Sequence, residues 1–401
     1  MSTTTAGDYY TGIVINVPAK KLSYTILRLR ASATKGRYFY DATVNNVTNF
    51  RTAVVTHGVK IIDFSGRYGD VYRNELRAEY KTNVYITQIG QSYVEPKKNH
   101  LCNEVVSCAV DYVEVAIDGI DHGIIVYEYV RGMNLIYFFN HMTPKLEQNP
   151  LTKRAAYFAY VEFVFKMAIS ICHIVHVLHT FGIFHNDIKP DNFVITYDES
   201  EEHRPIPNNF KILAVDFGLS CAIEVPIGAD VPIPRTTRCM KDERGFMRYG
   251  GTQKYLDPRA TSKSAERPPP TAMNIEPEDT FASFEYFETY SVAKTINAYL
   301  IDRYFANETD QNVLVFLREL VKDMTGSFAY RKNIAIYEGF LKRALEVVQA
   351  AHMVEFGELP INVLDEGFDS LSASGSEIKL PQRASNNDDD NTQYKLKNKL
   401  K

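Results

Sequence analysis

Two short segments concentrate the side chains that could do chemistry. Residues 185–192 have the sequence HNDIKPDN, and residues 214–218 have the sequence AVDFG. The carboxylate of Asp216 and the amide of Asn192 are hard oxygen ligands of the kind that Mg²⁺ prefers, and Mg²⁺ is usually held by few protein groups. Asp187 adds a second carboxylate, and Lys189 adds a cation that can offset negative charge beside it. These residue types could hold a hard cation beside an anionic group.

These segments resemble the catalytic loop and the metal-binding motif of eukaryotic-type protein kinases. In phosphoryl transfer the protein mainly positions groups and neutralises charge. The resemblance implies that Asp187 orients the substrate hydroxyl and that Lys189 lies near the transferred phosphoryl group. It also implies that Asn192 and Asp216 hold Mg²⁺ against the phosphates of ATP. A lysine at position 189 implies Ser/Thr rather than Tyr specificity.

Two flanking segments extend the resemblance. Residues 250–258, GGTQKYLDP, resemble the substrate-docking end of the kinase activation segment. Thr252 occupies the position whose hydroxyl, in Ser/Thr kinases, bridges the catalytic aspartate and lysine. Residues 124–132, IIVYEYVRG, resemble the fifth strand and the hinge. There the Glu128 carbonyl and the Val130 amide and carbonyl would pair with adenine.

The nucleotide-binding segment is less regular. Residues 59–72, VKIIDFSGRYGDVY, resemble strand one, a glycine-rich loop and strand two, with Phe64 in the place of the first glycine. Gly66 and Gly69 would let the backbone approach the phosphates without a Cβ in the way.

Three readings compete for the lysine that binds the α and β phosphates. We favour Lys81, with Glu104 as its carboxylate partner on the following helix. In the second reading Thr87 occupies the lysine's position and the lysine is missing. The third reading, Lys60, requires an earlier glycine loop around Gly36 and is ranked last.

Other positions depart from the family pattern or suggest metals. Arg259 replaces a glutamate, so it would face the cation of Arg331 unless another carboxylate intervenes. Glu288 stands in place of a buried aspartate and could accept backbone hydrogen bonds from the catalytic loop. Three histidines, His173, His176 and His179, recur every three residues, and we interpret them as one side of a helix rather than as metal ligands.

The elements that must position these residues follow from periodicity. Up to about residue 130 the chain consists of short β-rich runs, and from residue 135 the apolar spacing is helical. Together with the family resemblance, this change implies an α+β, bilobal protein-kinase-like fold with a small β-rich N-lobe and a larger α-helical C-lobe. The expected divisions are an N-terminal extension (1–54), a nucleotide-binding N-lobe (55–130), a catalytic C-lobe (131–358) and a disordered tail (359–401).

Composition limits the class of protein. The chain has 401 residues and a formal charge of −4, which gives no global reason to expect a nucleic-acid or membrane partner. The apolar run 157–184 is interrupted by charges and predicts a core helix. Five cysteines without C-x-x-C spacing predict neither a disulfide framework nor a zinc site, and favour a reducing compartment. We expect a cytoplasmic or nuclear protein, in the host cell if the chain is similar to kinases of large DNA viruses.

The sequence thus predicts a Ser/Thr protein kinase that uses ATP and Mg²⁺ and acts on a protein substrate. One alternative is a pseudokinase scaffold, motivated by Thr87 in the lysine position and by the missing first glycine. The other is a small-molecule phosphotransferase of the aminoglycoside-kinase type, which shares the His-x-Asp…Asn loop.

Overall fold

The computed structural model divides the chain into two compact units, which we describe separately. Unit 1 comprises residues 1–131 and 213–239, and unit 2 comprises residues 132–212 and 240–401. The structure describes residues 9–17, 20–33, 37–44, 54–93, 101–148, 153–198, 206–207, 209–223, 232–233, 238–239, 251–258, 277–301, 311–326 and 331–356. The predicted tail, Arg259, and the tip of the hairpin around Gly36 lie outside these ranges.

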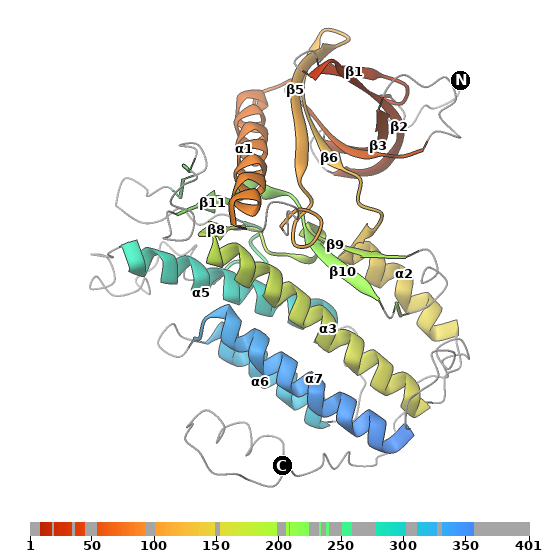
Figure 1. Cartoon of the computed structure of the whole chain (residues 1–401), viewed down its shortest axis with the longest axis vertical. Coiled ribbons are helices and arrows are strands. Elements are labelled where there is room, and N and C mark those ends of the chain that lie inside the picture. Colours follow the sequence, from red (N-terminus) through yellow and green to blue (C-terminus); the bar gives the residue numbers. More distant parts are fainter. Residues whose placement is uncertain are drawn as a thin grey trace. The chain divides into compact units, whose positions relative to one another are not determined.

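Unit 1 is built on a six-stranded antiparallel sheet that curls strongly (Figure 1). The strand order is β1-β2-β3-β4-β6-β5. The strands are β1 (Val14–Val17), β2 (Leu22–Ala33), β3 (Arg37–Val44), β4 (His57–Asp63), β5 (Ala109–Ile117) and β6 (Ile120–Glu128).

The first three strands belong to the same sheet as the fourth. Along β1 exposed and buried residues alternate, as expected for a strand with one face on a core. Its buried Ile15 and Val17 share an apolar cluster with Ile26 of β2 and Ile61 of β4. The predicted boundary at residue 54 would cut this sheet, so residues 1–54 are not a separate extension.

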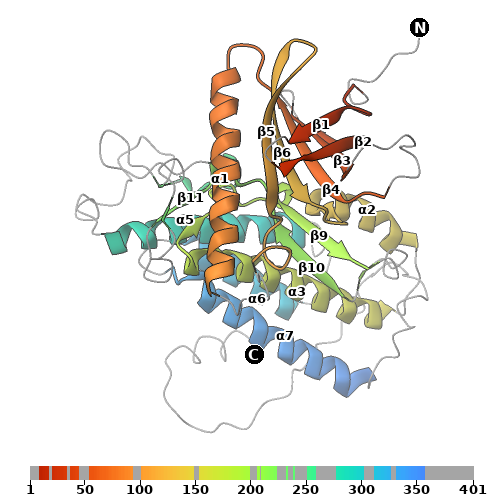
Figure 2. The ribbon, with the colours of Figure 1, turned by 45° about the horizontal axis from the view of Figure 1, so that its top comes forward.

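The predicted strand after Gly69 is wrong, because helix α1 (Gly69–Tyr93) begins there (Figure 2). The buried positions Leu76, Glu79, Asn83 and Ile86 recur every three or four residues, which is helical spacing. This stretch contains many β-branched and aromatic residues, which favoured the strand, but packing of one helix face against β5 and β6 overrides that propensity.

The two glycines serve the turn that joins β4 to α1. Gly66 has a φ of +84°, a conformation that glycine adopts without steric cost. A Cβ on Gly69 would lie 1.9 Å from the carbonyl oxygen of Phe64, so only glycine fits at this helix start. A tight turn therefore accounts for both residues in this structure.

Unit 1 also contains two disulfide bonds, Cys102–Cys108 and Cys221–Cys239. The sequence prediction of no disulfide framework is therefore wrong. The spacings of 6 and 18 residues follow no standard motif. The remaining cysteine, Cys172, is free and buried in unit 2.

Unit 2 consists mainly of long helices. They are α2 (Leu135–Gln148), α3 (Lys153–Thr180), α5 (Pro277–Ile296), α6 (Gln311–Thr325) and α7 (Ile334–Phe356), with a π-helical turn at Asn297–Ile301. Helices α3 and α7 pack side by side (Figures 1 and 2). The stretch Ala159–Thr180 of α3 is long and apolar enough to cross a membrane, but 61% of its most apolar window is buried, as expected for a core helix.

Short elements follow α3. They are β8 (Ile183–Phe184), a 3-10 turn (Pro190–Asn192), β9 (Phe193–Tyr197), which pairs with β7 (Met133–Asn134), and β10 (Phe210–Ala214), in which the chain passes to unit 1. Unit 1 then adds the 3-10 turn Phe217–Leu219 and β11 (Cys221–Ala222).

Candidate active site

A buried lysine lies at the centre of unit 1. The Nζ atom of Lys60, on β4, lies 2.7 Å from Glu79 Oε2 and 2.7 Å from Asp216 Oδ1. Glu79 belongs to α1, and its second oxygen accepts a hydrogen bond of 2.5 Å from the Tyr127 hydroxyl on β6. Three separate segments of unit 1 are therefore joined by one cation.

Burial makes these charges depend on one another. Lys60 and Glu79 are both about 2% exposed, whereas the Asp216 side chain is 30% exposed. Burial by itself lowers the pKa of the Lys60 amine, but Asp216 and Glu79 more than offset this, and the pKa lies above its usual value. Burial raises the pKa of Glu79, although the bonds from Lys60 and Tyr127 favour its carboxylate. The Lys60 ammonium is thus held charged, beside a partly exposed carboxylate.

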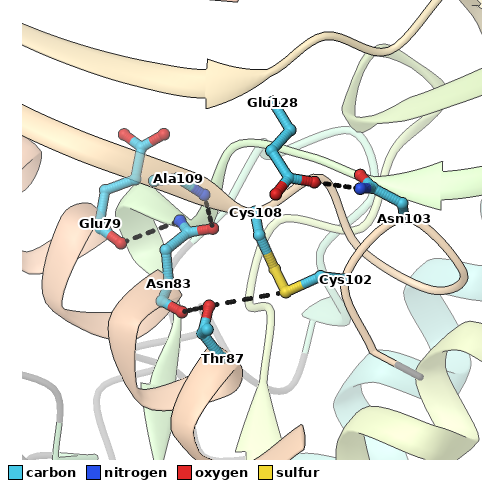
Figure 3. The surroundings of a disulfide bond; sticks show 8 residues. All are labelled: Glu79, Asn83, Thr87, Cys102, Asn103, Cys108, Ala109 and Glu128. Atoms are coloured by element: carbon cyan, nitrogen blue, oxygen red, sulfur yellow. Dashed lines mark hydrogen bonds between the residues drawn. A yellow bond between two sulfur atoms is a disulfide. The ribbon is translucent and has the colours of Figure 1, made fainter. Parts of the chain in front are cut away.

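Helix α1 is fixed to the loop that follows it (Figure 3). The Asn83 side chain donates to the Glu79 carbonyl and accepts from the Ala109 amide, at 3.0 and 3.2 Å. Thr87 lies 3.5 Å from the sulfur of Cys102, which the disulfide joins to Cys108. The disulfide therefore closes the loop against the same helix that carries Glu79.

The same loop also holds the strand before Asp216. Ser107 donates its amide proton to the Ala214 carbonyl at 3.0 Å, and Ala214 donates to Val105 at 2.9 Å. Asp216 itself has a φ of +64°, in the left-handed region that residues other than glycine seldom adopt. Such backbone conformations cluster at functional sites, where the surrounding structure holds them.

The structure does not place the predicted Lys81 and Glu104 in this cluster. Lys81 lies on the exposed face of α1, and Glu104 is exposed in the loop after that helix. Lys60, ranked last from the sequence, is the lysine that contacts two carboxylates, and Glu79 is its partner. Thr87, on α1, bonds to the Asn83 carbonyl at 3.0 Å.

A signal for Lys60 was present in the sequence. Lys60 lies between Val59 and Ile61 in a β-rich run, and Glu79 follows 19 residues later, close to the separation that the family has. A phosphate loop at Gly66 and Gly69 would place the lysine after residue 72, which favoured Lys81 over Lys60.

The predicted hinge residues lie at the end of unit 1. Glu128 closes β6, its amide donates to the Cys108 carbonyl at 3.2 Å, and its carboxylate accepts from the Asn103 side chain (Figure 3). The Val130 carbonyl accepts a hydrogen bond of 3.0 Å from Arg30. The pairing of these groups with adenine stays a prediction.

Unit 2 brings together four residues that the sequence singled out. Asp187 Oδ1 accepts from the amide and the hydroxyl of Thr252, both at 2.8 Å. Asp187 Oδ2 accepts from Lys189 Nζ at 2.6 Å and from Asn192 Nδ2 at 3.0 Å. Lys189 also donates to the Thr252 hydroxyl at 2.8 Å, so this hydroxyl bridges the aspartate and the lysine as expected.

The loop that carries Asp187 rests on a buried acid. Glu288, on α5, is fully buried and accepts the Asn186 amide proton at 2.5 Å, which confirms the expected backbone bond. Its other oxygen lies 2.7 Å from His179 Nε2, at the end of α3. Asn186 has a φ of +63°. The acid thus ties the loop to both helices and holds it in an unusual conformation.

A second buried acid fixes the segment after Thr252. Asp257 lies 2.8 Å from Arg331, and both side chains are fully buried. Arg331 also donates to backbone carbonyls of Tyr286, Thr325 and Gly326. Asp257 therefore supplies the carboxylate that the sequence required next to the Arg331 cation.

Comparisons with known proteins bear on the fold. No family model matches the chain. A stretch of 55 residues is 44% identical to calcium-dependent protein kinase 29 of Arabidopsis thaliana, and the match spans 14% of this chain but only 9% of that protein. The solved BubR1 kinase domain aligns with 88% of this chain and 89% of its own, with 13% identity and a TM-score of 0.50. The chain has a protein-kinase-like fold.

Proposed function

We propose that the protein is a Ser/Thr protein kinase that transfers the γ-phosphate of ATP to hydroxyls of a protein substrate. The observation that carries the proposal is the network of Asp187, Lys189 and Thr252, in which a carboxylate is oriented by a cation, a hydroxyl and a backbone amide. In this role Asp187 accepts the proton of the substrate hydroxyl, and Lys189 offsets the charge that develops on the phosphoryl group.

Lys60 takes the role of the phosphate-binding lysine, in place of Lys81. Glu79 stabilises the charge of the Lys60 ammonium group, which also contacts the partly exposed carboxylate of Asp216. Gly66, Gly69 and Glu104 are not retained as nucleotide-binding residues, because the structure uses both glycines in a turn and exposes Glu104. Glu128 and Val130 are retained as adenine-binding residues.

Each of the two residues proposed to hold Mg²⁺ offers a suitable oxygen atom within its own unit. Asp216 of unit 1 offers a partly exposed carboxylate. Asn192 of unit 2 uses its amide nitrogen for both of its bonds to Asp187, so its oxygen is the atom that it can offer. Both are hard oxygen ligands. Bound Mg²⁺ would neutralise charge on the phosphates of ATP.

The test compares four proteins in a transfer assay with radiolabelled ATP and generic protein substrates: the wild type and the variants Lys60→Met, Lys81→Met and Asp187→Asn. We expect Asp187→Asn and Lys60→Met each to lower transfer by about 100-fold or more, and Lys81→Met to match the wild type. Melting curves verify that each variant is folded, and Lys60→Arg retains a buried cation if Lys60→Met is not folded.

Two results would replace the proposal. A wild type that binds ATP but transfers no more phosphate than Asp187→Asn would establish the alternative, a pseudokinase scaffold. Transfer to free aminoglycosides or choline, with none to protein, would establish a small-molecule phosphotransferase. The contact of Thr252 with Asp187 and Lys189 favours a polypeptide substrate, because the resemblance assigns that segment to substrate docking.

A further inference from the structure

Helices α3 and α7 of unit 2 carry a cluster of side chains that the proposed reaction does not use. His173 Nδ1 lies 3.0 Å from Glu338 Oε1, and His176 Nδ1 lies 3.0 Å from Glu338 Oε2. One suitable atom from each of the three residues lies within 4.8 Å of the other two. The two histidines are three residues apart on α3, so they occupy neighbouring positions on one face of that helix.

We propose that His173, His176 and Glu338 bind a divalent transition-metal ion of the zinc type, which links α3 to α7. Two imidazole nitrogens and one carboxylate form a ligand set that Zn²⁺ uses in proteins, with water in the fourth position. Pairs of ligands from facing helices, including pairs at i and i+3, are an established way to hold metals in helical bundles.

The distances allow such an ion after a small adjustment. Zinc binds imidazole nitrogen and carboxylate oxygen at about 2.0–2.2 Å, so two ligands of a tetrahedral ion lie roughly 3.4 Å apart. The two nitrogens lie 3.0 Å from different oxygens of Glu338, as hydrogen bonds, and one atom from each residue lies within 4.8 Å of the other two. The ion would replace these hydrogen bonds. The ion requires the Nδ1 lone pair of each ring, which leaves the proton on Nε2.

Burial divides the cluster into an anchored and an open side. The Glu338 side chain is 5% exposed, whereas His173 and His176 are 52% and 41% exposed. The carboxylate is therefore held in place by the helix packing around it, and the imidazoles face solvent. An ion can enter from solvent and keep a water ligand without any rearrangement of the core.

One feature opposes metal binding. Lys342 Nζ lies 2.5 Å from Glu338 Oε1, so a cation already neutralises the carboxylate. The Lys342 side chain is 54% exposed and can move into solvent when an ion enters. The metal must displace Lys342 from Glu338. We therefore expect Lys342→Met, which removes this cation, to raise the affinity for the metal.

The site is separate from the catalytic residues of unit 2. His179, one turn further along α3, lies 2.7 Å from Glu288. A metal at the cluster would fix α3 against α7, and α3 is the helix whose end supports the loop of Asp187 through His179. Its effect on phosphotransfer would therefore be indirect, and its binding can be measured in a protein without catalytic activity.

The experiment is a calorimetric titration of the full-length Asp187→Asn protein, under non-reducing conditions, with zinc chloride and 5 mM Mg²⁺ in the buffer. Magnesium prefers oxygen ligands and does not compete for imidazole. We expect one Zn²⁺ per chain, at least a tenfold loss of affinity in His176→Ala and in Glu338→Gln, and a gain in Lys342→Met. His141→Ala, which removes an exposed histidine of α2, serves as the matched control and retains the wild-type affinity.

The same titration can overturn the proposal. Absence of Zn²⁺ binding, or an equal loss in His141→Ala and His176→Ala, would leave the cluster as an ion pair between helices. Because the His176 side chain is half exposed, its truncation leaves the core intact, and a melting curve in the absence of metal verifies this. Because the titration uses the Asp187→Asn protein, its result does not depend on the outcome of the kinase assay.

Discussion

The buried ion pair between Asp257 and Arg331 gives the sharpest test of the energetics of unit 2. Both side chains are fully buried, and the guanidinium also serves three backbone carbonyls. In Arg331→Met the Asp257 carboxylate remains in the interior without its cation, which costs about 3–5 kcal/mol. Asp257→Leu leaves the buried guanidinium without its carboxylate partner, and we expect a loss of similar size.

The double variant separates the pair from its surroundings. Replacing both charges by apolar groups removes the unpaired charge, and the remaining cost is three carbonyls without their donor, about 1 kcal/mol each. We therefore expect the double variant to lose about 3 kcal/mol, well below the sum of the two single losses.

The assay is urea unfolding followed by far-ultraviolet circular dichroism, which reports on the helices that dominate unit 2. The chain has no tryptophan, so fluorescence offers less contrast. The variants are compared by the shift of the midpoint at a constant slope. If the single losses simply add in the double variant, or if Arg331→Met costs less than about 1 kcal/mol, the reasoning about a desolvated pair is refuted.

Three further predictions concern both units. Thr252→Val removes the hydroxyl that joins Asp187 to Lys189. We expect transfer in the radiolabel assay to fall about 100-fold, because displacement of catalytic groups costs this much. Wild-type turnover would contradict this prediction. Tyr127→Phe removes a donor to buried Glu79 and should cost about 1–3 kcal/mol in urea unfolding, and an unchanged midpoint would show that the bond contributes nothing. We expect alkylation of the native chain without reductant to modify no cysteine, as read by mass spectrometry. Four cysteines form disulfides, and burial raises the pKa of the Cys172 thiol. Rapid labelling of the other four cysteines would refute the disulfides.

The grouping of side chains in unit 2 could be predicted from the sequence because most of these residues are close together along the chain. Asp187, Lys189 and Asn192 lie within six positions, so local spacing largely fixes their geometry, and the structure joins them to Thr252. The change from strands to helices was predictable from periodicity, and the kinase-like fold from the resemblance of these motifs.

Unit 1 was harder to predict, because its central contacts join distant segments. Lys60 reaches Asp216 across 156 positions, and no local pattern reports such a contact. The residues of α1 have β-forming side chains at helical spacing, so local propensity and tertiary packing pointed to different elements. The disulfides were missed for the same reason, since their spacing carries no recognisable motif.

The distribution of cysteines gives the two units different redox chemistry. All four bonded cysteines belong to unit 1, and one bond closes the loop that holds both α1 and the strand before Asp216. Unit 2 contains only the buried thiol of Cys172. A reductant therefore changes the covalent structure around Lys60 and Glu79, while the covalent structure around Asp187 stays the same. Reduction would thus act on covalent bonds in only one of the two units that carry the proposed catalytic residues.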